Sequence, residues 1–261
     1  RRMRLSYLRN IWEDVLVSLI FFTIIPISKF RNAESPTNLT RAQWTFPLVG
    51  ALVGFVTILV ASIFNYLGLN TTTSATLGII AGISLTGFSP EHGLANAIEG
   101  FGKVTEKPEK IGIIKLNKLR TFGTLGLIIL ILLKVSLIAD LLDSPGCFLS
   151  VIAAFSLGRT SIVILRRIAM AASDESYTLF IDRATFKQTL LAILLGAGWL
   201  IPINFILPFV AIATMLILTF GVRLLSYNQI GGITGNVLGA SIQIVEISLL
   251  VVLDIWLHNG T

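Results

Sequence analysis

Cysteine is almost absent from this sequence, because Cys147 is the single residue of this type among 261. One thiol excludes an internal disulfide and a metal site built from several thiolates. Charged residues are also scarce, at 13% of the chain, whereas soluble domains carry roughly 25%. A chain with so little charge has too few polar groups to cover a surface in water, which excludes a soluble globular protein. The first residues also lack the pattern of a cleavable signal peptide.

Long apolar runs take the place of the missing charge. Hydrophobic residues make up 54% of the chain, the mean hydropathy is +0.85, and the runs reach the roughly 20 residues that cross a membrane. A further run, 189–222, is too long for one helix, and its two prolines, Pro202 and Pro208, split it into two spans joined by a turn. The other predicted spans are residues 46–69, 72–90, 122–139, 147–165 and 232–257. The sequence thus predicts an all-α polytopic transmembrane bundle of seven spans.

Residues 15–28 are apolar but short, so they could cross the membrane, enter and leave it, or lie along its surface. The distribution of lysine and arginine decides between these options. If this segment does not cross, every loop cation falls on the side of the N-terminus, and only Lys134 and Arg159 remain inside spans. The positive-inside bias of membrane proteins favours that arrangement.

The charge pattern therefore predicts the location of the protein and of its loops. We expect a single integral membrane domain, residues 1–261, in the cell inner (plasma) membrane, with a non-crossing N-terminal segment. The N-terminus and the long polar loops are expected to be cytoplasmic, and the C-terminus outside. The net charge of +6 has the same origin, so the lipid bilayer is an expected partner and nucleic acid is not.

Polar side chains gather after the second predicted span. His92, Asn96 and Glu99 follow the helical spacing i, i+4, i+7, which places them on one helix face, and Glu91 is beside them. These residue types can bind a metal ion or donate and accept hydrogen bonds. A polar helix end at the membrane surface would produce the same pattern.

Two further segments on the same side could bind phosphate. Lys115, Lys118 and Arg120 precede a glycine and a span, and such cations bind phosphate oxygens or serve only to orient the chain in the membrane. Thr234 and Asn236 lie among glycines at a predicted helix start, where anions bind. There the alternative is close helix packing through small residues.

Ionisable residues also occur inside the predicted spans, namely Lys134, Arg159 and Glu246. Such groups are costly in a membrane and normally face a polar cavity or a partner of opposite charge. We therefore expect Arg159 to have a functional role. For Lys134, the alternative is a side chain that extends to the membrane surface.

Taken in order, these motifs resemble the cobalamin synthase family, the adenosylcobinamide-GDP ribazoletransferases. Residues 21–26 are similar to the early family run Phe-Leu-Thr-Arg-x-Pro, and residues 86–101 to Thr-Gly-x-x-His-x-Asp-Gly-Leu-Ala-Asp-x-x-Asp-Gly. Residues 115–123 resemble Lys-Asp-Ser-Arg-x-Gly-Thr-Phe-Gly, and 231–240 resemble Gly-Gly-x-Thr-Gly-Asp-x-x-Gly-Ala. Arg159 matches the arginine of a mid-chain Ser-Arg motif.

The resemblance implies a reaction and a set of residues. Family members join α-ribazole, or its 5′-phosphate, to adenosylcobinamide-GDP, release GMP and use Mg²⁺. The implied catalytic residues are Glu91, His92, Asn96, Glu99 and Asn236, of which the first four would also be metal ligands. The implied substrate-binding residues are Thr86, Gly87, Lys115, Lys118, Arg120, Thr121, Arg159, Gly232, Thr234 and Gly235. The resemblance also admits a membrane complex with other cobalamin-assembly enzymes.

Several acids of the family pattern are replaced in this chain. His92, Asn96 and Asn236 stand at aspartate positions, Pro90 stands at the histidine position, and Leu116 follows the motif lysine in place of an acid. Mg²⁺ prefers carboxylates and water, whereas imidazole and amide ligands favour Mn²⁺ or Co²⁺. The alternative function is therefore a catalytically impaired homologue that binds a corrinoid or nucleotide, or that scaffolds membrane partners. A transporter would also fit seven spans. The sequence, however, lacks the paired broken helices in corresponding halves that many transporters have.

Overall fold

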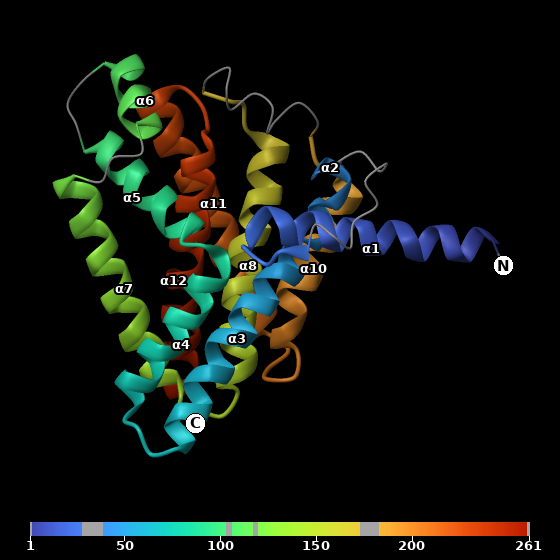
Figure 1. Ribbon diagram of the computed structural model, residues 1–261, viewed down its shortest axis with the longest axis vertical. Coiled ribbons are helices and arrows are strands. Elements are labelled where there is room, and N and C mark those ends of the chain that lie inside the picture. Colours follow the sequence, from blue (N-terminus) through green and yellow to red (C-terminus); the bar gives the residue numbers. More distant parts are fainter. Residues whose placement is uncertain (1, 28–38, 103–105, 117–119, 173–182, 260–261) are drawn as a thin grey trace.

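The described part of the chain is almost entirely helical. The structure is a computed structural model that describes residues 2–27, 39–102, 106–116, 120–172 and 183–259 (Figure 1). Two short 3₁₀ segments, η2 (Gln43–Thr45) and η3 (Gly198–Leu200), extend helix ends. The helices are α1 (Arg2–Phe22), α2 (Leu39–Ala42), α3 (Phe46–Tyr66), α4 (Thr71–Thr86), α5 (Ser89–Phe101), α6 (Lys107–Lys115), α7 (Thr121–Leu141), α8 (Cys147–Ile168), α10 (Phe186–Ala197), α11 (Leu207–Ile230) and α12 (Gly235–Asn259).

Among the described residues, five helical segments are long and apolar enough to cross a membrane, as expected for a multi-pass membrane protein. They are Leu39–Tyr66, Thr121–Leu141, Cys147–Ile168, Leu207–Ile230 and Gly235–His258. The predicted spans 46–69, 122–139, 147–165 and 232–257 are confirmed as helices with similar bounds, whereas α11 extends eight residues beyond the predicted end at 222 and includes Arg223. α10 and η3 form a shorter apolar helix over Phe186–Leu200. The run 189–222 is therefore split as predicted, with Pro208 near the start of α11.

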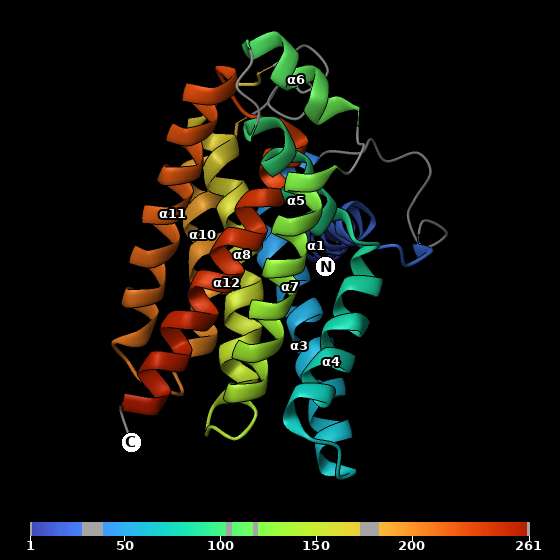
Figure 2. The ribbon, with the colours of Figure 1, turned by 90° about the vertical axis from the view of Figure 1, so that its left-hand side faces the viewer.

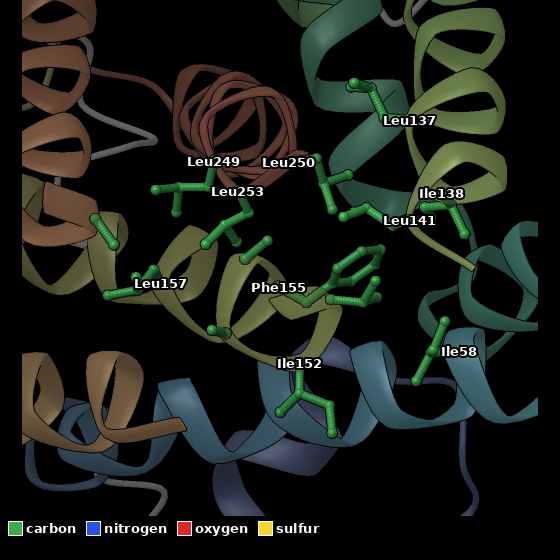
Figure 3. Packing of buried hydrophobic residues seen from close by; sticks show 14 of the residues in the cluster. Ile58, Leu137, Ile138, Leu141, Ile152, Phe155, Leu157, Leu249, Leu250 and Leu253 are labelled. Carbon is green, nitrogen blue, oxygen red and sulfur yellow. The ribbon is translucent and has the colours of Figure 1, made fainter. Parts of the chain in front are cut away.

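Helix α8 is at the centre of the bundle and is almost wholly buried. Glycines allow α3 to approach it closely, because a Cβ on Gly50 would lie 2.3 Å from the carbonyl oxygen of Phe155. Around this contact, leucine, isoleucine and phenylalanine side chains from α3, α7, α8 and α12 fill one core (Figure 3). Labelled members are Ile58, Leu137, Ile138, Leu141, Ile152, Phe155, Leu157, Leu249, Leu250 and Leu253.

Helix α1 lies across the bundle and is not among the candidate spans (Figure 1). Its buried Asp14 fixes it to the start of α3, since Arg41 Nε donates to this carboxylate at 2.6 Å and Trp44 Nε1 at 3.0 Å. The hydroxyl oxygens of Ser18 and Thr45 are 2.6 Å apart in the same contact. These polar contacts dock the C-terminal half of α1 on α2 and η2, beside the start of α3.

The predicted span 72–90 is shorter in the structure and is followed by a separate helix. α4 ends at Thr86, and Gly87 and Phe88 adopt left-handed conformations with φ of 61° and 62°. This reversal breaks the helix, and Pro90 near the start of α5 begins a new one. The prediction was wrong at this boundary, because the apolar run continues past Gly87 and Phe88 and does not indicate their left-handed conformations.

The connections fall at two opposite ends of the bundle (Figures 1 and 2). One end holds the turns 67–70, 142–146 and 201–206 together with the C-terminus. The other end holds α5, α6 and the turn between α11 and α12. The motifs of α5, α6 and the turn before α12 are thereby collected at one end of the molecule.

Candidate active site

A cavity of about 480 Å³ opens at this motif-bearing end. It is bounded by α1, α5, α6, α8 and α12, so it joins segments that are far apart in the sequence. Its polar lining residues are Ser89, His92, Lys115, Thr234 and Asn236, and its apolar lining includes Phe21, Phe22, Ile114, Ile162, Leu238 and Ile242. Three of the motifs singled out in the sequence thus face the same space.

Two glycines bring α5 and α12 into backbone contact at this cavity. A Cβ on Gly93 would lie 2.9 Å from the carbonyl oxygen of Asn236 and 3.1 Å from Cα of Gly239. Because the helices cross so closely, His92 and Asn96 of α5 lie beside Asn236 of α12. The Asn96 amide nitrogen is 3.3 Å from His92 Nε2 and 3.5 Å from Asn236 Oδ1.

Backbone contacts fix the start of α12. Gly231 has a φ of 79°, and a Cβ on Gly232 would lie 2.8 Å from the backbone of Ala171 and Ala172. Ala172 N donates to Ile233 O at 3.0 Å, which holds the turn against the end of α8. Thr234 Oγ1 accepts from Val237 N at 3.4 Å, as a capping residue does. The predicted substrate residues Thr234 and Gly235 line the cavity, whereas Gly232 supports the turn behind it.

Helix α6 supplies the cation of the cavity. Asn236 Nδ2 donates to Ile114 O at 3.0 Å, and Lys110 Nζ donates to Gln229 Oε1 at 2.5 Å, so α6 is tied to α12 and α11. Lys115, which follows Ile114, is exposed and lines the cavity. Arg120 and Thr121 are exposed at the start of α7 and are not part of the lining. Lys118 lies outside the described residues.

The two acids of α5 bind partners on other helices and not His92. Gln243 Nε2 donates to Glu91 Oε1 at 3.0 Å, and Lys134 Nζ lies 4.0 Å from the same oxygen. Burial raises the pKa of Glu91 above its ordinary value, an effect opposed by nearby Lys134. Glu99 Oε2 accepts from the backbone nitrogen of Gly123 at 2.9 Å and so fixes the start of α7.

Of the predicted metal ligands, the structure brings His92 and Asn96 together, whereas Glu91 and Glu99 bind other partners. Within the described ranges, three or more histidine, cysteine, aspartate or glutamate residues nowhere gather in a way that could hold a metal ion. The donors around His92 are amides, which supply no negative charge. This donor set does not fit Mg²⁺, which is usually held by one or two carboxylates together with substrate phosphates.

A second polar cluster is buried in the bundle, beside the cavity. Glu246 of α12 accepts from Arg159 of α8 and from Lys134 of α7, the latter at 2.6 Å. Lys134 also donates to Gln243 Oε1 at 2.8 Å, which links the cluster to Glu91. Arg159 thus binds an acid and does not line the cavity.

The sequence singled out Lys134, Arg159 and Glu246 one by one, but not their pairing or the part played by Gln243. An uncharged amide inside a span is the signal that could have indicated Gln243. Thr86 and Gly87, also predicted to bind substrate, lie at the end of α4. The hydroxyl of Thr86 donates to Ile83 O at 3.0 Å and Gly87 ends the helix.

Comparison with known proteins agrees with the motif resemblance. An adenosylcobinamide-GDP ribazoletransferase from Mesorhizobium japonicum is 27% identical over 256 residues, covering 96% of both chains. One from Clostridium botulinum is 31% identical over 255 residues, covering 94% of this chain and 99% of the relative. One from Azorhizobium caulinodans is 29% identical over 250 residues, covering 92% and 95%.

No solved structure shows significant similarity to the chain. The model of the cobalamin-5-phosphate synthase family matches residues 14–254. This match covers nearly the whole chain, from the C-terminal half of α1 to the last turns of α12. The chain therefore belongs to the cobalamin-5-phosphate synthase family.

Proposed function

We propose that this protein is an adenosylcobinamide-GDP ribazoletransferase. It joins α-ribazole, or its 5′-phosphate, to adenosylcobinamide-GDP and releases GMP. An oxygen of the ribazole forms a bond to the corrinoid-linked phosphorus, and the bond between the two phosphates breaks. The observation that carries this proposal is the single cavity lined by residues from three separate family motifs, around His92, Lys115 and Thr234.

The lining of the cavity suits the parts of these substrates. Lys115 and the first turn of α12 offer positive charge to the phosphates. His92 is placed to accept the proton of the attacking hydroxyl as a general base. Phe21 and Phe22 form an aromatic wall with Phe46, and Phe21 is exposed, so a flat ring system can stack there.

The supporting residues hold these groups in place in our proposal. Arg159, Lys134 and Glu246 fix α7, α8 and α12 to one another, and Glu91 and Glu99 fix α5. Arg120 and Thr121, exposed near the same end, are proposed to contact outer parts of the substrates.

The family resemblance implies Mg²⁺, which would neutralise charge on the pyrophosphate. Because the described donors do not fit this ion, we propose that dependence on Mg²⁺ is weak. Mn²⁺ and Co²⁺ accept imidazole and amide ligands more readily, so any metal effect on turnover should favour them.

We also propose seven crossings, with the cavity on the cytoplasmic side. α4 and the α10–η3 segment would complete the five longer helices, although at about 1.5 Å per residue they are shorter than the roughly 30 Å apolar core of a bilayer. Local thinning of the bilayer accommodates short spans. The cytoplasmic placement suits large phosphorylated substrates, and a complex with other cobalamin-assembly enzymes could form at the same face.

A second candidate function is binding of a corrinoid or nucleotide without turnover. The observation that favours it is the lack of any carboxylate among the described lining residues of the cavity. The two functions share the ligand but differ in the release of GMP.

The test is GMP release from adenosylcobinamide-GDP and α-ribazole by the purified protein in lipid vesicles. Release that requires both substrates and falls at least tenfold in His92→Ala supports the enzyme. Substrate binding without GMP release under Mg²⁺, Mn²⁺ or Co²⁺ would establish the second candidate. Neither binding nor release would overturn both.

A further inference from the structure

The described side chains that line the cavity include a cation and an imidazole but no acid. We infer that this cavity binds a phosphate group directly, through Lys115, His92 and the first turn of α12, without a divalent cation. The inference rests on the proposed function for the class of ligand, a phosphate ester or pyrophosphate. It concerns how that ligand is held.

The charges around the cavity favour an anion and oppose a cation. Lys115 comes from α6 and His92 from α5, so two separate elements direct nitrogen groups to one space. Gly235 and Asn236 add the N-terminus of the 25-residue helix α12, which carries partial positive charge. Lys115 and the start of α12 would repel a divalent cation, and the described lining residues offer no carboxylate to offset that repulsion.

The nearest acids are held away from the cavity. Glu91 is 5% exposed and accepts from Gln243, and Glu99 is 1% exposed and accepts from the backbone of Gly123. The hydrogen bond holds one oxygen of each carboxylate, so a movement of either side chain into the cavity would break it. In their present positions, Glu91 and Glu99 therefore do not form a metal site at the cavity.

The amide of Asn236 is used in a way that a carboxylate could not reproduce. Its Nδ2 donates to the carbonyl of Ile114 at 3.0 Å, the residue before Lys115. An aspartate has no donor for this carbonyl when it is ionised. The amide thus ties α6 to α12 and places Lys115 at the cavity. The replacement of the family aspartate by Asn236 therefore helps to form the phosphate site.

Equilibrium binding of inorganic pyrophosphate and of GMP to the purified protein, in EDTA and in Mg²⁺, tests this inference. We expect binding in EDTA that Mg²⁺ changes by less than about twofold. Removing a charged hydrogen-bond donor costs on the order of tenfold in affinity or more, so Lys115→Ala should weaken binding by that factor. Lys187→Ala is the matched control, because Lys187 is exposed in α10 and does not line the cavity.

A second variant keeps the test independent of folding. His92→Asp places an acid in the cavity. Pyrophosphate and GMP should therefore fail to bind this variant in EDTA and should bind it again with Mg²⁺. Binding by the unmodified protein that requires Mg²⁺, or that Lys115→Ala leaves unchanged, would overturn the inference. Metal-free binding without GMP release would instead overturn only the enzyme proposal, whereas GMP release with strictly Mg²⁺-dependent binding would overturn only the inference.

Discussion

Glu246 organises the buried charges of the bundle at the scale of single residues. Its carboxylate accepts from both Lys134 and Arg159 and is itself fully buried. Removing charges from water costs several kcal/mol per ion, and only close partners offset it. A carboxylate between two cations leaves one positive charge, which the neighbouring Glu91 can balance when ionised. The net charge of this cluster therefore depends on whether Glu91 is protonated.

Replacing Glu91 with glutamine tests this variable charge. Burial is the largest effect on Glu91 and raises its pKa, so the folded protein prefers the neutral carboxyl. The stability gained from this preference is present below the ordinary pKa of 4.5 and is lost as pH rises through the folded value. Since glutamine stays neutral, Glu91→Gln should match the parent in thermal stability at the acidic end. It should exceed the parent increasingly as pH rises.

The measurement is the unfolding temperature in detergent between about pH 4.5 and 8, with Glu106→Gln as the control at an exposed acid. A Glu91→Gln variant that is less stable than the parent by the same amount at every pH would contradict the expectation. That result would mean that contacts independent of pH, such as the hydrogen bond from Gln243, decide the effect, and not the charge of Glu91.

Restoring the family acids tests the replaced positions. His92→Asp with Asn96→Asp should raise GMP release in Mg²⁺ above that of the parent, because one carboxylate would then line the cavity and a second would lie beside it. Adding Asn236→Asp should lower stability by about 1–3 kcal/mol, since the carbonyl of Ile114 loses its donor. Turnover in Mg²⁺, Mn²⁺ and EDTA and the unfolding temperature are the two readouts.

The third substitution separates two explanations of the amide. If Asn236→Asp leaves stability unchanged and adds further Mg²⁺-dependent turnover, the amide is a dispensable replacement. If it costs stability and turnover together, the amide is part of the framework that places Lys115.

At the scale of elements, the crossing of α5 and α12 decides where the cavity forms. The glycines of residues 231–240 admitted two interpretations in the sequence, anion binding and close helix packing. The structure supports both, since Gly235 and Gly239 line the cavity and Gly239 also packs against Gly93 of α5. One glycine-rich segment therefore supplies both the contact and the open helix start.

Substitution of Gly93 tests this crossing. An alanine Cβ would lie 2.9 Å from the carbonyl oxygen of Asn236, so α5 must shift from α12. We expect Gly93→Ala to lose about 1–3 kcal/mol of stability, the usual cost of overpacking, and to weaken pyrophosphate binding as His92 moves. Gly221→Ala in α11 is the matched control, because a Cβ there meets nothing within 4 Å. Equal unfolding temperatures for the two variants would contradict the close crossing.

Sequence reasoning found the helices more readily than the site. The helical spacing of His92, Asn96 and Glu99 correctly indicated a helix, α5. It did not indicate that α5 turns Glu99 towards Gly123 and Glu91 towards Gln243, because these partners come from α7 and α12. Local spacing sets the face of a helix, but the packing of other helices decides what that face meets.

At the scale of the whole molecule, the two ends of the bundle differ in charge. The turns 67–70, 142–146 and 201–206 contain no lysine or arginine. The opposite end carries the described cations Lys110, Lys115, Arg120, Arg166, Arg167, Arg183, Lys187 and Arg223. The hydropathy of the chain predicted the five long apolar helices, and the structure groups these cations at the end that also holds the cavity.

This asymmetry predicts the orientation in the membrane. Loops rich in lysine and arginine stay in the cytoplasm, so a reporter fused after Leu116 should be cytoplasmic and reporters fused after Ser144 and Asn204 should be outside. Asn204 is the more demanding site, because it is outside only if the short α10–η3 segment crosses the bilayer. A cytoplasmic signal at Asn204 with an outside signal at Ser144 would show that α10 does not cross. An outside signal at Leu116 would overturn the cytoplasmic placement of the cavity, and with it the access of its phosphorylated ligands from inside the cell.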